Sequence, residues 1–305
     1  MFRIIVIGQG ALGKSLAALL SRRVHVTVFD KNLFIRKALK NNRIILKEKG
    51  QSRKAQIYSV ESISQLQGLD VDVLIIATKI MDFRKALQDV AFLNPGCVLF
   101  LQNGLFDISW AGKLFKKALI CRGTTTMACQ EKAPGEVDVF YQGQMYLGGD
   151  GAPMVGRIFK QCQMPCKVFR AADRVVWAKL IFSSVMNPLP VITNQGYDIL
   201  AKDKNIWKLV QDAVKEGKAT ARALGIKLGF DPMKLIMRVR HGDLKGILHR
   251  GTLFQDIKAC RPTEIDYITQ AIVKEAHKIG VKTPALDMVL RSFNKARIPR
   301  LSRRG

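Results

Sequence analysis

The sequence predicts an α/β N-terminal domain followed by an all-helical C-terminal domain. Three observations support this prediction. The chain opens with a β-branched run, a glycine turn and a helical run, and two nearly continuous apolar runs of strand length follow. From about residue 174 the hydrophobic spacing is helical almost to the end. Because the composition changes near residues 169–172, the predicted domains are 1–170 and 171–305.

The first element has the glycine spacing of a dinucleotide-binding turn. Residues 2–7 form an apolar strand, and helical spacing begins after Gly8-Gln9-Gly10-Ala11-Leu12-Gly13. In this motif the first glycine makes the tight turn, the second lets a pyrophosphate approach the backbone, and the third lets the helix pack on the strand. The free N–H groups of the helix then face the phosphates. We therefore predict a Rossmann-type domain that binds a dinucleotide through these six residues.

The residues after the second strand argue both ways about the cofactor. Residues 24–29 alternate as a strand, and Asp30 follows about twenty residues after the first glycine, where a carboxylate accepts from the ribose hydroxyls. Asp30 thus favours NAD, whereas the adjoining Lys31 can pair with the 2'-phosphate of NADP. From the residues alone the choice stays open.

Two polar residues follow the next predicted strands. Residues 71–78 and 97–102 are apolar runs of the kind buried in a parallel sheet, with a helix predicted over 81–92 between them. Lys79 and Asn103 come just after their carboxyl ends, where open α/β sheets hold ligands. The alternatives are a solvated loop lysine and a plain Asn-Gly turn. Short strands are predicted from residue 123 to 147, ending at Gly148.

One helix of the C-terminal domain carries an amine among apolar residues. Lys179, Ser183 and Asn187 recur at intervals of four in residues 177–188, so they share a helical face. Desolvation in such surroundings moves a lysine pKa toward neutrality and makes the amine a proton donor near pH 7. The alternative is a snorkelling lysine on an ordinary core helix.

The remaining helical region offers one further candidate. A long amphipathic helix is predicted over 206–224, and the tract from His241 through His249 to residue 251 is predicted as a loop without a carboxylate at catalytic spacing. Thr263 and Asp266 fit a capping box, which places Glu264 in the first turn of a helix. Glu264 either complements the helix dipole or orients Lys179 and contacts the nicotinamide ribose.

Charge, cysteine content and hydropathy limit the classes of binding partner and the cellular compartment that we expect. The formal net charge of +26 favours anionic partners, but the basic residues are scattered without aromatic interleaving, so no nucleic-acid stripe is identified. Six dispersed cysteines suit reduced thiols, and neither they nor the four histidines have metal-ligand spacing, so we predict no metal. The glycines and Lys14 interrupt the only signal-like run, and no run of about 18 apolar residues follows. A cytoplasmic protein that contacts no membrane is expected.

Taken together and in order, these motifs resemble the ketopantoate reductase (2-dehydropantoate 2-reductase) family over nearly the whole chain. The segments that carry the resemblance are Gly8-x-Gly10-Ala11-Leu12-Gly13, Thr78-Lys79, Gln102-Asn103-Gly104, Gly123-Thr124-Thr125-Thr126, Trp177-x-Lys179 with Asn187-Pro188-Leu189, and Gln255-Asp256-Ile257 with Thr263-Glu264-Ile265-Asp266-Tyr267. The resemblance implies a Rossmann domain for NADPH, a helical domain, and reduction of ketopantoate to D-pantoate in the biosynthesis of pantothenate and coenzyme A.

The resemblance also implies roles for individual residues. Lys179 would be the catalytic proton donor, Glu264 would assist at the cofactor, and Asn103 would touch both cofactor and substrate. Further positions carried over are Lys79 and Ala128 at the cofactor, Asn187 at the substrate, and Thr252 in place of a serine that binds the substrate carboxylate. Lys31 replaces an arginine that grips the 2'-phosphate, and this favours NADP despite Asp30, with NAD as the alternative.

Two departures from the family pattern leave the substrate open. Ser183 stands where the family usually has a substrate-binding asparagine, and the turn at Tyr197 lacks another expected amide. One alternative is therefore a reductase of the same fold that acts on a different 2-oxo acid. The alternative from another class is a non-catalytic protein that senses NADP or binds nucleic acid, suggested by the charge. A homodimer is one option for the oligomeric state, which the sequence leaves undetermined.

Overall fold

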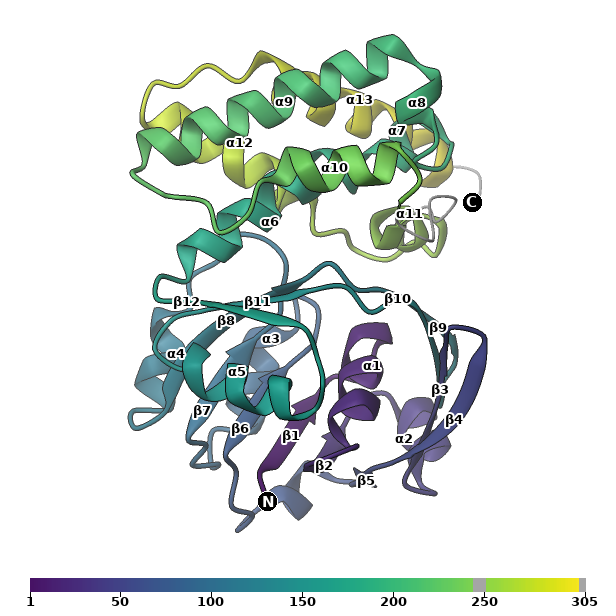
Figure 1. Ribbon diagram of the computed structural model, residues 1–305, viewed down its shortest axis with the longest axis vertical. Helices are drawn as coiled ribbons and strands as arrows, with labels where there is room; N and C mark the ends of the chain where they lie inside the picture. The colour runs from purple at the N-terminus through teal and green to yellow at the C-terminus, as the bar shows by residue number, and fades with distance from the viewer. Residues whose placement is uncertain (244–250, 302–305) are drawn as a thin grey trace. The chain divides into compact units, whose positions relative to one another are not determined.

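The computed structural model describes residues 1–243 and 251–301. The chain forms two compact units, of which the first contains residues 1–102 and 107–172. The second contains Asn103–Phe106 and the chain from Asp173 onward. The first unit combines helices with sheets, whereas every described element from Asp173 onward is a helix (Figure 1). The predicted fold class is thereby confirmed.

The first unit is built on an eight-stranded sheet. Its order is β12-β11-β8-β7-β6-β1-β2-β5, and the pairings from β8 through β5 are all parallel. β11 runs antiparallel to β8, and β12 runs parallel to β11. The strands are β1 (Arg3–Ile7), β2 (His25–Phe29), β5 (Tyr58–Ser59), β6 (Val73–Ile76), β7 (Cys97–Phe100), β8 (Leu119–Thr125), β11 (Met145–Gly148) and β12 (Cys166–Phe169).

A second, four-stranded sheet packs against the same core. It has the order β4-β3-β10-β9 and consists of β3 (Arg43–Glu48), β4 (Gln51–Gln56), β9 (Ala128–Ala133) and β10 (Glu136–Tyr141). The helix α1 (Ala11–Leu20) lies between the two sheets, and its buried leucines share one apolar cluster with residues of both (Figure 1). The remaining helices of this unit are α2 (Leu33–Leu39), η1 (Ile63–Leu66), α3 (Phe83–Asp89), α4 (Ser109–Leu114) and α5 (Ala152–Gln161).

The second unit packs its helices around α6 (Asp173–Met186). The core contains Trp177, Leu180, Ile181 and Val185 of α6 together with apolar residues of the neighbouring helices. The other helices of this unit are α7 (Leu189–Thr193), α8 (Ile199–Lys202), α9 (Lys204–Ala223), α10 (Pro232–Arg240), α11 (Gly251–Lys258), η2 (Ile265–Tyr267), α12 (Thr269–Lys278) and α13 (Pro284–Leu301). Residues 173–193 are apolar and long enough to cross a membrane, but 78% of the 18-residue window is buried, as in a core helix of a globular protein.

The capping box predicted at Thr263 and Asp266 is wrong. Glu264 is the N-cap of the short helix η2, without a capping side-chain hydrogen bond, and α12 begins only at Thr269. The Tyr267 carbonyl at the end of η2 accepts from Leu105 N at 2.8 Å, a partner outside the local sequence that no local capping rule includes. Of the predicted histidine loop, His241 is the exposed C-cap of α10, while His249 lies outside the described residues.

A carboxylate on α9 caps the N-terminus of α13. Glu216 accepts hydrogen bonds from Ala285 N at 2.8 Å and from Leu286 N at 2.9 Å. The first N–H groups of a helix have no partner within the helix, so a partly buried acceptor from another element takes the place of an N-cap side chain. Glu216 therefore joins two helices that are distant in sequence.

We predict that Glu216→Ala lowers the free energy of unfolding by about 1 to 2 kcal/mol, because two backbone donors lose their acceptor. Urea denaturation followed by circular dichroism measures this change. Asp212→Ala, one turn earlier on α9, is the matched control: it removes only a surface ion pair with Lys208, so the change stays within about 0.5 kcal/mol. Equal losses in the two variants would contradict the capping role.

Candidate active site

The glycine turn between β1 and α1 is shaped by close packing at two of its three glycines. A Cβ atom on Gly13 would lie 1.9 Å from the carbonyl oxygen of Gly8, so helix and turn are too close for a side chain. Gly8 has φ +93°, and a Cβ atom there would lie 2.8 Å from Thr78 N. A Cβ atom on Gly10 would meet nothing within 4 Å. The turn therefore packs tightly against the sheet at Gly8 and Gly13 and is open at Gly10.

The turn is open at Gly10, where α1 begins. Gly10 is the N-cap of this ten-residue helix, and no side chain caps its N-terminus or places an acidic group in its first turn. Free backbone N–H groups and the positive end of the helix dipole favour an anion at such a position. Gln9, the other polar residue of the turn, is fully buried and donates from Nε2 to Val6 O and Gly8 O, both at 3.2 Å.

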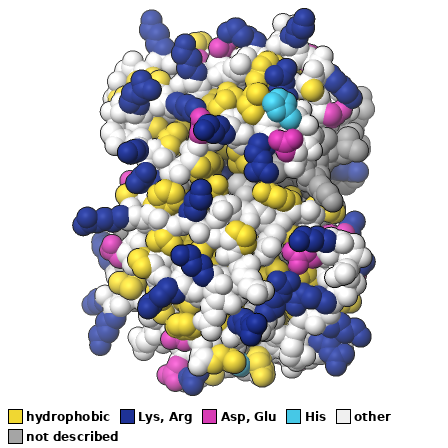
Figure 2. Space-filling model, viewed as in Figure 1, with side chains coloured by type: hydrophobic (Ala, Val, Ile, Leu, Met, Phe, Trp, Pro, Cys, Tyr) yellow, Lys and Arg dark blue, Asp and Glu magenta, His cyan; other side chains and the backbone are white. Residues whose placement is uncertain are grey.

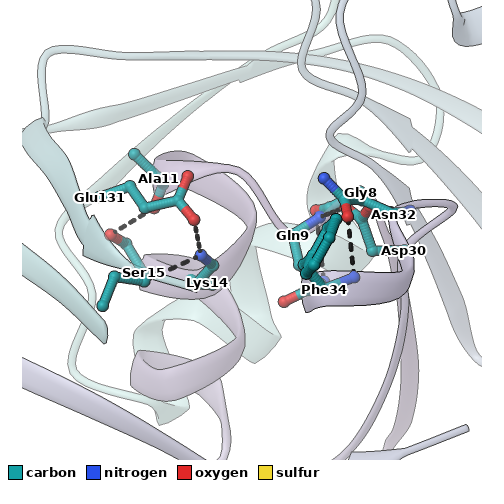
Figure 3. Close-up of polar contacts among 10 residues, drawn as sticks. Gly8, Gln9, Ala11, Lys14, Ser15, Asp30, Asn32, Phe34 and Glu131 are labelled. Atoms are coloured by element: carbon teal, nitrogen blue, oxygen red, sulfur yellow. Dashed lines mark hydrogen bonds and ion pairs between the residues drawn. The ribbon is translucent and has the colours of Figure 1, made fainter. Parts of the chain in front are cut away.

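Asp30 binds the turn directly (Figure 3). Its Oδ2 accepts from Gln9 N at 2.6 Å, and its Oδ1 accepts from Asn32 N at 2.8 Å. Gly8 N donates to Phe29 O at 2.9 Å, so the end of β2 and the glycine turn are connected at two consecutive residues. The carboxylate is thereby held beside the turn by the backbone, in the position from which the ribose of a dinucleotide is contacted.

Lys31, the residue predicted to contact a 2'-phosphate, has a different partner in the structure. Its Nζ lies 2.6 Å from Oδ1 of Asp82, the residue before α3. The Lys31 side chain is 76% exposed, so this is a surface ion pair. Such pairs contribute at most about 1 kcal/mol.

The ends of β6 and β7 are joined beside the turn. Gln102 donates from Nε2 to Ile76 O at 2.9 Å and to Thr78 O at 3.0 Å, which fixes the backbone just before Lys79. Lys79 itself is partly buried. Three buried oxygens at the ends of β1, β6 and β7 lack a hydrogen-bond partner among the described residues, namely Gln9 Oε1, Thr78 Oγ1 and Gln102 Oε1.

Sequence reasoning assigned no role to Lys14, although it is fully buried next to the turn. Its Nζ pairs with Glu131 and lies 3.5 Å from Ala133 O, so it connects α1 with β9 (Figure 3). Burial lowers the pKa of the Lys14 ammonium, and Glu131 and Asp30 oppose that change. Lys14 immediately follows the third glycine, but the sequence contained no signal that a carboxylate 117 residues later would reach it. Ala128, predicted to lie along the cofactor, is the partly buried first residue of the strand that Lys14 holds.

These observations fit a dinucleotide. The turn is open where a pyrophosphate would approach, the helix N-terminus has free donors, and Asp30 lies at the ribose position. A polar ligand bound along the ends of β1, β6 and β7 would also supply partners near the three unpaired oxygens. Gly8, Gln9, Gly10, Ala11, Leu12 and Gly13 would hold the diphosphate of such a cofactor. The phosphate contacts are a prediction.

In the second unit, Lys179 lies on α6 with the surroundings that the sequence indicated. It is partly buried, and its Nζ is 4.8 Å from the centre of the Phe182 ring. Burial lowers the pKa of this ammonium to about 8. At neutral pH the amine is therefore mostly protonated and still able to give up its proton, which is the property of a general acid.

Ser183 and Asn187 continue the face that begins at Lys179. Ser183 is buried, at 2% exposure, and Asn187 N donates to Ser183 O at 3.0 Å, so the helical repeat extends through Asn187. Tyr197 places a hydroxyl group in this unit. The sequence analysis noted only that the turn at Tyr197 lacks an amide expected from the family pattern. A Cβ atom on Gly251 would lie 2.8 Å from that hydroxyl, so Tyr197 lies against the start of α11. Gly251 is the first residue of α11 and directly precedes Thr252. The Thr252 side chain lies outside the described residues.

The loop with Asn103 and the segment with Glu264 come together in the second unit. Gly104 has φ +98°, a Cβ atom on it would lie 2.5 Å from Tyr267 O, and Leu105 N donates to the same oxygen at 2.8 Å. Leu105 and Tyr267 are 162 residues apart in sequence, and the hydrogen bond joins the two segments at the backbone. Thr269 Oγ1 then donates to Ser184 O at 2.8 Å, which connects this assembly to α6 beside Ser183. The structure thus attaches the loops of Asn103 and Glu264 to one another, and through α12 to the helix of Lys179.

We predict that Gly13→Ala lowers the free energy of unfolding by about 3 kcal/mol or more, because the new methyl group must displace the Gly8 carbonyl. Gly10→Ala is the matched variant, since its methyl group enters open space. It should change stability by less than about 1 kcal/mol while weakening dinucleotide binding. Urea denaturation and fluorescence titration separate the two effects. Equal stability of the two variants would show that the helix and turn can move apart.

Comparisons with known proteins agree with this architecture. Residues 4–150 match the family described as Ketopantoate reductase PanE/ApbA, and residues 171–296 match Ketopantoate reductase PanE/ApbA C terminal. A 2-dehydropantoate 2-reductase of Lactococcus lactis subsp. lactis is 28% identical over 298 residues, which cover 94% of this chain and 95% of that protein. A 2-dehydropantoate 2-reductase of Archaeoglobus fulgidus is 24% identical over 286 residues, covering 92% of each.

Solved structures resemble the fold over its full length. The ternary structure of D-mandelate dehydrogenase with NADH and anilino(oxo)acetate superposes with a TM-score of 0.85 at 25% identity, covering 98% of this chain and 99% of that one. The crystal structure of 2-dehydropantoate 2-reductase from Geobacter metallireducens has a TM-score of 0.84 at 20% identity and covers 97% of this chain and all of that one. With both parts of the family pattern matched in order, the chain belongs to the ketopantoate reductase family of oxidoreductases.

Proposed function

We propose that this protein reduces the C2 carbonyl of a 2-oxo acid to a hydroxyl group with a reduced nicotinamide dinucleotide, and that the first candidate substrate is ketopantoate, giving D-pantoate. The observation that carries the proposal is the amine of Lys179, partly buried and with a pKa of about 8, on one helical face with Ser183 and Asn187. Family membership supplies the reaction class, and the curated relatives are named 2-dehydropantoate 2-reductases.

The chemistry divides between the cofactor and the chain. When bound, a reduced nicotinamide supplies the hydride. Lys179 supplies the proton to the carbonyl oxygen as negative charge develops on it, and its ammonium also stabilises that charge. A pKa near 8 suits this task because the amine is protonated at neutral pH and gives up its proton more readily than a solvated lysine.

The other assigned residues bind and orient the reactants in this proposal. Asn187 and Asn103 offer amide groups to the substrate, and Thr252 offers a hydroxyl group to its carboxylate. Glu264 assists at the cofactor, and Lys79 and Ala128 line it. NADP, favoured by the position of Lys31, is the cofactor expected from the resemblance, and the choice between NADP and NAD depends on Asp30. A cytoplasmic location and a homodimer belong to the same proposal.

A specific observation favours a second candidate, a reductase of another 2-oxo acid. Ser183 is buried one turn after Lys179, and the Tyr197 hydroxyl lies against Gly251, where burial raises the pKa of the phenol above its ordinary value. Phe182 adds an aromatic ring beside the amine. Two aromatic rings and one short hydroxyl suit an apolar or aromatic side chain on the substrate. Among the structural relatives is a D-mandelate dehydrogenase, which supports testing aromatic 2-oxo acids.

The charge of +26 keeps a binding protein as the alternative from a different class. In Figure 2 the Lys and Arg side chains are spread over the visible face instead of forming one patch. A general positive field of this kind attracts small anions as well as nucleic acid. A nucleotide-sensing or nucleic-acid-binding protein would bind a dinucleotide without turnover, and its affinity for nucleic acid would fall steeply with salt.

We predict that Lys179→Ala lowers turnover by about 10² to 10⁴, the usual contribution of a positioned general acid, and leaves cofactor affinity nearly unchanged. In the wild-type protein, turnover in the reducing direction should fall as pH rises through about 8, because the protonated amine is lost; the residual activity of the variant should lack this limb. Lys202→Ala, which removes an exposed lysine paired with Asp198, is the control with unchanged kinetics. Wild-type turnover in Lys179→Ala would assign the proton to another group.

A panel of 2-oxo acids scored by oxidation of NADPH and NADH decides between the two substrates. If ketopantoate is the substrate, its kcat/KM exceeds that of phenylglyoxylate and branched 2-oxo acids, and Asn187→Ala raises its KM with little change in kcat. The reverse order, with Tyr197→Ala raising the KM for phenylglyoxylate, would favour the second candidate. An unchanged KM in Asn187→Ala for every acid would remove this residue from the substrate site.

A further inference from the structure

We propose that the dinucleotide site selects NADH over NADPH, and that Asp30 is the residue that makes the selection. The proposal rests on the proposed function, because it assumes a nicotinamide dinucleotide in the glycine turn. It reverses the preference expected from Lys31, and it depends on how the two side chains are held.

The backbone fixes Asp30 in place. Both of its oxygens accept backbone N–H groups, Oδ2 from Gln9 in the glycine turn at 2.6 Å and Oδ1 from Asn32 at 2.8 Å (Figure 3). A carboxylate offers about four acceptor positions, so two remain for hydroxyl donors. The side chain is only partly buried, so a ligand can reach it. A ribose with its 2'-hydroxyl free can therefore donate to a carboxylate that is already oriented.

A 2'-phosphate would meet the same carboxylate as a negative charge. Asp30 can turn away only by giving up its bonds to Gln9 and Asn32, and the bond to Gln9 belongs to the turn that would hold the diphosphate. Replacing the hydroxyl by a phosphate also removes a donor from a charge-assisted hydrogen bond. Both effects weaken NADPH relative to NADH.

Three cations in this part of the first unit are engaged with other groups. Lys31 pairs with Asp82, and Lys14 is buried against Glu131. Arg36 donates from Nη1 to the backbone oxygens of Asp30 at 2.9 Å and Lys31 at 2.7 Å, with its guanidinium 5.6 Å from the centre of the Phe29 ring. Because the Lys31–Asp82 pair is exposed and weak, Lys31 can still turn toward a phosphate. NADPH binding is therefore weakened rather than abolished.

Equilibrium titration with each reduced cofactor tests the proposal on the full chain without substrate, with isothermal titration calorimetry as the readout at constant ionic strength. The wild-type protein should bind NADH at least about tenfold more tightly than NADPH, which corresponds to about 1.4 kcal/mol. Asp30→Ser should weaken NADH and bring the two dissociation constants together or invert them. Asp89→Asn is the matched control: it removes a carboxylate from α3 that pairs with Lys85, and both constants should stay unchanged.

The outcomes separate this inference from the proposed function. Equal binding, or tighter binding of NADPH by the wild-type protein, overturns the role of Asp30 while leaving the reductase proposal intact. Binding of neither cofactor overturns both proposals. If Asp30→Ser fails to fold because the turn loses its acceptor, Asp30→Asn keeps one acceptor oxygen and removes the charge, and an unchanged ratio of dissociation constants in that variant would contradict the inference.

Discussion

The close approach of α1 to β1 is the constraint on which the first unit depends. The carbonyl of Gly8 occupies the space that a side chain at position 13 would need, so the helix can take this position only with a glycine at position 13. This contact fixes where the N-terminus of α1 lies, and the free N–H groups there are the predicted donors to a bound phosphate. It also sets the depth of α1 between the two sheets, which is why Lys14 is fully buried and reaches Glu131 on β9.

Hydrogen bonds around the turn also fix the residues that we propose to contact the dinucleotide. Gly8 and Gln9 donate to Phe29 and Asp30 in succession, so the end of β2 follows the turn, and backbone N–H groups hold the carboxylate in its orientation. Gln102 performs a comparable task between β7 and β6, where its amide holds the backbone before Lys79. Lys31, in contrast, is on the surface and held only by Asp82. Our proposal therefore assigns cofactor selectivity to the fixed carboxylate of Asp30 and not to the exposed ammonium of Lys31.

Spacing in the sequence predicted the structural features that depend on neighbouring residues, and it missed contacts between residues that are distant in sequence. The glycine turn, β1, β2, β6, β7, α6 and α9 were all predicted from spacing. A lowered pKa for Lys179 was predicted as well, because apolar residues on both sides of it in the sequence indicated a buried helix. The hairpin of β3 and β4 was missed because its strands are largely polar and bury mainly Ile44, Leu46 and Ala55. The Lys14–Glu131 pair, the bond from Leu105 to Tyr267 and the Tyr197–Gly251 approach join residues far apart in sequence, and no spacing rule identifies them.

The same distinction explains why the reaction class is better supported than the substrate. The proposed reaction needs a glycine turn to bind the dinucleotide and one amine to donate a proton. Each of these two features is visible within a single stretch of about a dozen residues. In the proposed function, substrate recognition draws on side chains from several segments of the second unit: Ser183 and Asn187 on and after α6, Tyr197 before α8, and the start of α11. A buried serine and a partly buried tyrosine at these positions would change the shape and polarity offered to a substrate while leaving the amine in place. Under this proposal the chain keeps the chemistry of its family and changes the substrate through a few replacements, among them Ser183 and Tyr197.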